Sequence, residues 1–155
     1  MSLKLDSIDN KLLIALQEDC TRSIADLAQL VGISQSPCWR RVQRLRQSGI
    51  IAREAAILDP SKMGWGLQVF AHVQLSSHGR ANVTEFTEAV TKHPQVLECH
   101  ILLGSVDCLL RVVARDVEDF QRFFFTHLST LAAVQDVNSM VSLQEIKCSS
   151  VLPLP

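Results

Sequence analysis

The 155-residue sequence lacks any run of about 20 apolar residues, the length that a helix needs to cross a bilayer. Its N-terminus lacks a basic stretch followed by an apolar run, so it does not resemble a secretory signal. The five cysteines form no C-x-x-C pair, and no His or Cys spacing resembles that of a metal site. These absences predict a cytoplasmic protein with reduced thiols, no membrane association, no metal and no other cofactor.

Patterns typical of enzymes are also missing. The sequence has no paired carboxylates at a useful spacing, no nucleophile elbow and no glycine-rich phosphate loop. With 47% hydrophobic residues, 20% charged residues and a net charge of -1, the composition is that of a globular protein rather than a non-specific nucleic-acid binder. We therefore expect no enzymatic activity and no catalytic residues.

One local charge pattern departs from this neutral average. No acidic residue occurs between Asp26 and Glu54, and within this interval four arginines lie in the seven positions 40–46. A basic face on a neutral protein is compatible with sequence-specific DNA binding, in which phosphate contacts are few and well placed.

Helical periodicity accounts for the first fifty residues. It predicts helices from Ser7 to about Asp19, from Ile24 to Val31 and from Gln35 to about Ser48. Gly32 suits the left-handed end of the second helix, and Ser34 is expected to cap the third. Two helices joined by a short turn containing glycine are typical of a helix-turn-helix motif, which we assign to residues 1–52.

The third helix is the one expected in the major groove of DNA. Its inward stripe is predicted to contain Cys38, Val42 and Leu45, and Trp39 is expected to pack against the first helix. Arginine can bond guanine and glutamine can bond adenine, whereas Arg41 on the flank is better placed for phosphates. The alternative is a solvated, arginine-rich face with no partner. The predicted DNA-binding residues are Ser34, Ser36, Arg40, Arg41, Gln43, Arg44 and Gln47.

A different pattern follows. Residues 50–58 are expected to be an extended strand, either a short wing or the exit from the first domain. Residues 53–66 are assigned to the linker or strand between the two domains. From residue 67 to 155 the sequence predicts strands and helices in the order β-α-β-β-α-β, a ferredoxin-like arrangement, so the fold class is α+β. The expected bounds are 67–76 (strand), 81–92 (helix), 96–103 and 108–114 (strands), 117–131 (helix) and 134–147 (strand).

The predicted strands carry apolar residues on both sides. Phe70, Leu102, Leu110 and Val112 indicate a sheet face that the two helices would leave uncovered. A second copy of the chain would cover it, so we expect at least a dimer.

Several segments together resemble the Lrp/AsnC family, the feast/famine regulators. In the first half they are residues 5–9 (LDSID), 31–42 (VGISQSPCWRRV) and 45–51 (LRQSGII). In the second half they are residues 96–100 (VLECH), 104–109 (GSVDCL) and 145–147 (EIK). The resemblance implies a transcription regulator that binds double-stranded DNA, forms homodimers through its C-terminal domain and assembles into higher oligomers, often octamers.

The resemblance also implies a small amino acid effector, bound near residues 104–107 and 136–140. Asp107 could hold its ammonium group, and amides near Gly104 its carboxylate. A soft apolar lining favours leucine or methionine. Alternatively, Asp107 only stabilises the turn. The predicted effector-binding residues are Leu102, Gly104, Ser105, Asp107, Cys108, Ser139 and Met140.

Two other functions stay open at this point. One is a DNA-organising protein that needs no effector. The other is an enzyme resembling the sirohaem decarboxylases, which would require His and Arg converging on a large pocket. This second alternative is disfavoured because no His occurs in residues 1–71.

Overall fold

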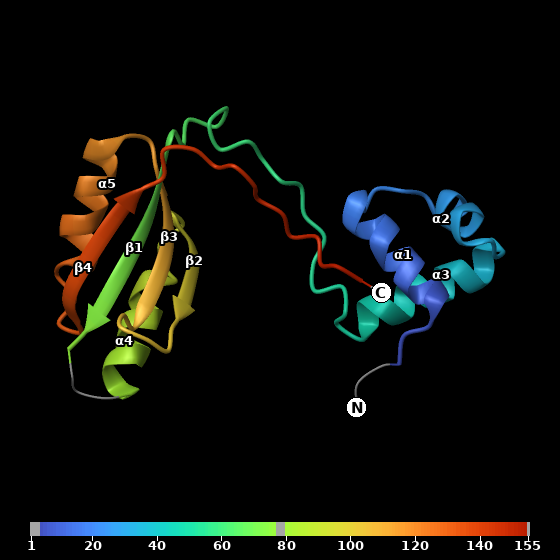
Figure 1. Ribbon diagram of the computed structural model, residues 1–155, viewed down its shortest axis with the longest axis horizontal. Coiled ribbons are helices and arrows are strands. Elements are labelled where there is room, and N and C mark those ends of the chain that lie inside the picture. Colours follow the sequence, from blue (N-terminus) through green and yellow to red (C-terminus); the bar gives the residue numbers. More distant parts are fainter. Residues whose placement is uncertain (1–3, 77–79, 155) are drawn as a thin grey trace. The chain divides into compact units, whose positions relative to one another are not determined.

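The computed structural model describes residues 4–76 and 80–154, which form two compact units (Figure 1). The N-terminal unit contains the residues up to Ile57 together with those from Lys147 onward, and the C-terminal unit contains Leu58–Ile146. The first is a helix-turn-helix domain and the second is an antiparallel sheet with helices. The predicted α+β class and ferredoxin-like order are therefore confirmed.

Three helices form the N-terminal unit: α1 (Ser7–Glu18), α2 (Ile24–Val31) and α3 (Gln35–Gln47). Their bounds agree with the predicted ones to within one residue. Gly32 ends α2 with φ of 71°, a left-handed conformation that a side chain would disfavour, so the chain turns tightly into α3.

The cap of α3 differs from the prediction. Ser34 occupies the N-cap position with extended backbone, but its side chain makes no capping hydrogen bond. An N-cap hydroxyl commonly bonds the amide three residues on, and that residue is Pro37, which has no N–H. Ser34 therefore marks the start of the helix without stabilising it through its hydroxyl.

The predicted inward stripe of α3 is confirmed, since Cys38, Val42 and Leu45 are all fully buried against α1 and α2. Trp39 lies one position beyond this stripe, is 52% exposed and is not part of the core of the three helices. Its packing against the first helix stays a prediction.

The strand expected over residues 50–58 is also wrong. The chain there has no β-pairing, and Ile57 is 88% exposed. An apolar extended sequence becomes a strand only where a neighbouring backbone can accept and donate its hydrogen bonds, and no described segment does so here.

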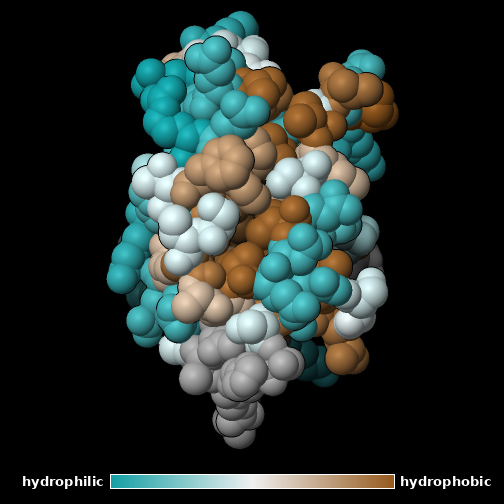
Figure 2. All heavy atoms as spheres, turned by 90° about the vertical axis from the view of Figure 1, so that its left-hand side faces the viewer, coloured by the Kyte–Doolittle hydropathy of each residue, from teal (hydrophilic) through white to brown (hydrophobic). Residues whose placement is uncertain are grey.

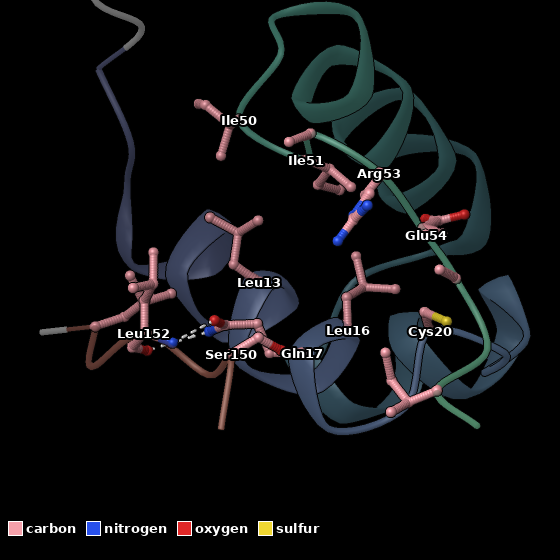
Figure 3. A pocket seen from close by; sticks show the side chains of 14 residues that line it. Leu13, Leu16, Gln17, Cys20, Ile50, Ile51, Arg53, Glu54, Ser150 and Leu152 are labelled. Carbon is pink, nitrogen blue, oxygen red and sulfur yellow. Dashed lines mark hydrogen bonds between the residues drawn. The ribbon is translucent and has the colours of Figure 1, made fainter. Parts of the chain in front are cut away.

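The end of the chain completes the N-terminal unit. The side-chain amide of Gln17 donates to the carbonyl oxygen of Leu152 at 3.2 Å, and its oxygen accepts from the Leu152 amide at 2.7 Å (Figure 3). Leu154 packs against the core formed by the three helices. The side chain of Gln17 thus pairs with both backbone groups of Leu152, as a neighbouring strand would.

The C-terminal unit is a four-stranded antiparallel sheet in the order β2-β3-β1-β4, with its helices on one face (Figure 1). Two elements end earlier than predicted. The helix predicted over 117–131 ends at residue 123 and continues as one π-helical turn, η1. The strand predicted over 134–147 ends at residue 141. The elements are β1 (Leu67–Leu75), α4 (Arg80–Val90), β2 (Val96–Ile101), β3 (Cys108–Ala114), α5 (Val117–Phe123), η1 (Phe124–Leu128) and β4 (Val134–Val141).

Successive side chains of β3 point to opposite faces of the sheet, and this corrects the expectation that Leu110 and Val112 lie on the face that the helices leave open. Leu110 and Val112 are fully buried on the same side as Cys108, so they face the helices and not the open side. On the other side, Arg111 binds Glu98 through Nη2 at 2.6 Å and lowers the pKa of that carboxyl. The open face is therefore a mixture of apolar and charged side chains.

Two histidines lie together where α4 and η1 meet. The ring centroids of His93 and His127 are 4.1 Å apart, and those of His93 and Phe123 are 5.5 Å apart in an edge-to-face arrangement. Burial, and secondarily repulsion from His127, lowers the pKa of His93 below its usual 6.5.

This pair predicts a pH dependence of stability. Since the unfolded chain takes up the proton more readily, the contribution of His93 is complete above about pH 6.5 and is lost as the pH falls towards the lowered folded-state value. The melting temperature should therefore drop between pH 7.5 and pH 5.5, and by less in His93→Gln. Equal drops in the parent and the variant would contradict this origin.

Within residues 4–76 and 80–154, no helix combines the length and the apolar character needed to cross a bilayer.

Candidate nucleic-acid interface

The predicted DNA-binding residues lie along the outer side of α3. Most of them are exposed, while Arg41 and Gln43 are half-buried at the edge of the helix. Three of the arginines line one shallow hollow with Pro37, of about 280 Å³. Three guanidinium groups around one hollow form a site suited to an anion, and phosphate oxygens are what arginine pairs best. The exposed residues are Ser34, Ser36, Arg40, Arg44 and Gln47.

A buried carboxylate organises two of these arginines, and the sequence reasoning missed it. Asp9 is only 1% exposed, and its two oxygens accept from Arg41 Nη1 at 2.8 Å and from Arg44 Nη2 at 2.6 Å. Arg41 Nη1 also donates to Asp6 at 2.7 Å. The hydrogen bond to Asp6, followed by the bond to Asp9, raises the pKa of Arg41.

The position of Asp9 in the helical pattern could have revealed this network. Asp9 shares the buried stripe of α1 with Leu12 and Leu16, and a carboxylate on a buried stripe requires a cation as partner. The nearest excess of cations in the sequence lies on α3.

The other two arginines of the cluster differ from this pair. Arg46 binds Glu54 at 2.8 Å, so its charge is already neutralised. Arg40 has no hydrogen bond or ion pair to another described residue and is exposed. Arg40 is thus the arginine of α3 whose whole guanidinium group is available to DNA.

The predicted effector loop is a tight connection between β2 and β3. The amide of Leu75 donates to Asp107 Oδ2 at 2.8 Å, so one carboxylate oxygen of Asp107 stabilises the neighbouring strand. The amide of Asp107 donates to the carbonyl oxygen of Val73 at 3.1 Å. The amides of Gly104 and Ser105 make no hydrogen bond to any residue in the described part of the chain. The loop therefore keeps exposed donors and one carboxylate oxygen.

One chain does not bring all the predicted effector residues together. Cys108 is fully buried on the helix-facing side of the sheet, where burial raises the pKa of its thiol to about 11. Met140 pairs with Phe70 in the sheet register and is 45% exposed, and Ser139 precedes it. Cys108 and Met140 lie three registers apart along β1, so Cys108 cannot line the surface that Met140 presents.

A second hollow, of about 460 Å³, lies within the N-terminal unit. Its walls come from α1, from residues 50–57 and from the C-terminal residues that Gln17 holds (Figure 3). Most of the residues that line this hollow are aliphatic. The residues near the C-terminus thus form one wall of an apolar hollow.

Comparison with known proteins places these features in a family. Residues 5–46 match the AsnC-type helix-turn-helix domain, and residues 68–152 match the Lrp/AsnC ligand binding domain. The chain belongs to the Lrp/AsnC family. As a member of that family it is a DNA-binding transcriptional regulator, and its C-terminal domain is the amino-acid-binding domain of the family.

Relatives of known name cover nearly the whole of this Lrp/AsnC regulator. The DNA-binding transcriptional activator DecR of Escherichia coli is 36% identical over 97% of this chain and 99% of its own length. The glutamate uptake regulatory protein of Zymomonas mobilis is 34% identical over 100% of this chain and 94% of its own.

Solved structures agree. A transcriptional regulator of Neisseria meningitidis, crystallised as a complex with L-Met, has a TM-score of 0.93 at 36% identity, and the alignment covers 97% of each chain. An AsnC family regulator of Agrobacterium tumefaciens has a TM-score of 0.91 at 38% identity, covering 96% of this chain and 97% of the other.

Proposed function

We propose that this Lrp/AsnC regulator recognises specific DNA sites through the exposed face of α3, and that a small apolar amino acid modulates its DNA affinity or assembly. The observation that carries the DNA-binding part is the acid-free surface of α3, where Arg40 has no partner among the described residues and Arg41 and Arg44 are held beside it. Bidentate contacts from such arginines to guanine would supply base preference.

The effector part is supported by the loop between β2 and β3. A zwitterion needs an anion for its ammonium and amide donors for its carboxylate, and the free oxygen of Asp107 and the exposed amides near Gly104 offer both. The solved relative from Neisseria meningitidis contains L-Met, which supports an apolar amino acid of that size.

The effector is expected to bind where chains meet. Since Asp107 lies in the loop before β3 and Ser139 lies on β4, with β1 between these two strands, a second chain would have to bring a complementary segment to complete the site. Figure 2 shows one face of the C-terminal unit, with a band of hydrophobic side chains between hydrophilic margins. Contiguous exposed apolar surface of this kind supports assembly into dimers and higher oligomers such as octamers.

A calorimetric titration tests the effector. Leucine or methionine should release or absorb heat on binding to the parent, whereas lysine should not, because the proposed lining, which includes Leu102 and Met140, is apolar. Asp107→Ala should abolish this heat, while Asp116→Ala, which alters an exposed helix cap elsewhere in the same unit, should not. A preference for lysine, or binding unaffected by Asp107→Ala, would contradict this site.

Light scattering tests the assembly. At micromolar concentration without DNA, the parent should have the mass of a dimer or a multiple of dimers. A stable monomer would contradict the proposal that chains pair through the C-terminal unit.

A further inference from the structure

Among the described residues, Asp9 is the one charged residue that is buried. It lies on α1 rather than on α3, the helix proposed to contact DNA. A buried carboxylate is costly unless cations and hydrogen bonds compensate it. Arg41 and Arg44 supply the cations, and the Asp6 amide adds a hydrogen bond at 3.2 Å. Both oxygens of Asp9 are therefore occupied.

The two arginines nevertheless keep donors for a ligand. An arginine has five N–H groups, and each of these two uses a single nitrogen on carboxylates. The side chain of Arg44 is 44% exposed and that of Arg41 is 27% exposed. Both arginines line the hollow that Arg40 also lines.

From this geometry we propose that Asp9 is a positioning residue that sets the DNA specificity of the recognition helix. It fixes two guanidinium groups before DNA arrives, so their ordering does not have to take place on binding. Its negative charge also offsets part of their attraction to phosphate, which every DNA sequence presents. Asp9 therefore favours correctly placed base contacts over general attraction to the backbone.

This inference rests on the proposed use of α3 in DNA recognition. It predicts a particular change when the carboxylate is neutralised. In Asp9→Asn the arginines gain freedom and net charge, so binding to unrelated DNA should stay equal or strengthen while binding to the specific site weakens. The quantity that changes is the ratio of the two affinities.

The experiment uses the full chain and two duplexes of equal length. One is recovered with the parent protein by repeated selection from a random-sequence pool, and the other is a scrambled version. Fluorescence anisotropy gives both affinities, and thermal unfolding shows that each variant is folded. For Asp9→Asn we expect the affinity ratio to fall by roughly tenfold, the scale of one bidentate base contact.

Glu18→Gln is the matched control. It removes one negative charge from the same helix, at an exposed residue whose partner is Arg22 and not an arginine of α3, while Asp9 keeps both of its arginines. Its affinity ratio should match that of the parent. If Asp9→Asn does not fold, Arg44→Lys takes its place, because lysine keeps the charge but loses the fork that Asp9 orients. It should lower the ratio in the same way.

Each other outcome overturns the inference. Equal loss of both affinities would assign Asp9 a purely structural role. An unchanged ratio in folded Asp9→Asn, or in Arg44→Lys where it replaces that variant, would show that the arginines need no positioning. Arg40→Ala distinguishes the positioning role of Asp9 from DNA recognition by α3. If Arg40→Ala lowers the affinity ratio and Asp9→Asn does not, only the positioning role of Asp9 is contradicted. If neither variant lowers the ratio, the proposed recognition of DNA by α3 is contradicted as well.

Discussion

Arg40→Ala is expected to weaken binding to the selected duplex by roughly tenfold to a hundredfold, the effect of losing one bidentate arginine–guanine contact. Arg40 is exposed and has no partner among the described residues, so its removal disturbs no contact within the fold. Stability should stay within about 0.5 kcal/mol of the parent. The loss should be larger for the selected duplex than for the scrambled one.

Arg122→Ala is the control for this change. It removes the same charge from an exposed helix position in the C-terminal unit, on α5. Its affinity for either duplex should match that of the parent. Equal binding by the parent and Arg40→Ala would contradict the assignment of Arg40 to base recognition.

Phe86→Ala is expected to lower the free energy of unfolding of the C-terminal unit by about 3–5 kcal/mol. Phe86 is fully buried between α4 and the sheet, and removing its ring leaves a cavity that the surrounding strands cannot fill. Since a domain of this size is stable by only about 5–15 kcal/mol, the variant should also assemble poorly.

Phe125→Ala is the matched variant, because the same ring is removed from a side chain that is 65% exposed. Its free energy of unfolding should change by less than about 1 kcal/mol. Denaturant titrations of both variants are compared at one chain concentration, since assembly contributes to apparent stability. Equal losses in the two variants would contradict the described core.

The sequence predicted best what is local. The bounds of α2 follow from Ser23, which caps its start, and from Gly32, which ends it, and both signals act within a few residues. Strand β3 is predicted residue for residue because Gly104 to Asp107 and Arg115 to Asp116 bound an apolar run.

What depends on distant partners could not be predicted in the same way. Residues 50–58 have the composition of a strand but no neighbouring backbone to pair with. The sequence predicts Leu110 and Val112 on the open face of the sheet, whereas in the structure they lie with Cys108 on the face that the helices cover. The docking of Leu152 on Gln17 joins residues 135 positions apart, and no periodicity reports such a contact.

In the candidate site, too, local features could be predicted from the sequence and tertiary contacts could not. The exposed face of α3 follows from helical spacing alone, and the structure has that face where it was expected. The network around Asp9 depends on how α1 crosses α3, a tertiary relation. For the effector residues, spacing in one chain is insufficient because a complete site would need a second chain.

The most direct test of the central claim is selection of DNA from one random-sequence pool by the parent and by Arg40→Ala, followed by sequencing of the bound fractions. We expect the parent to enrich a motif with two-fold symmetry, as a paired helix-turn-helix protein requires. We expect Arg40→Ala to lose base preference at one position in each half of that motif. No enrichment by the parent, or an identical motif from the variant, would contradict sequence recognition through α3.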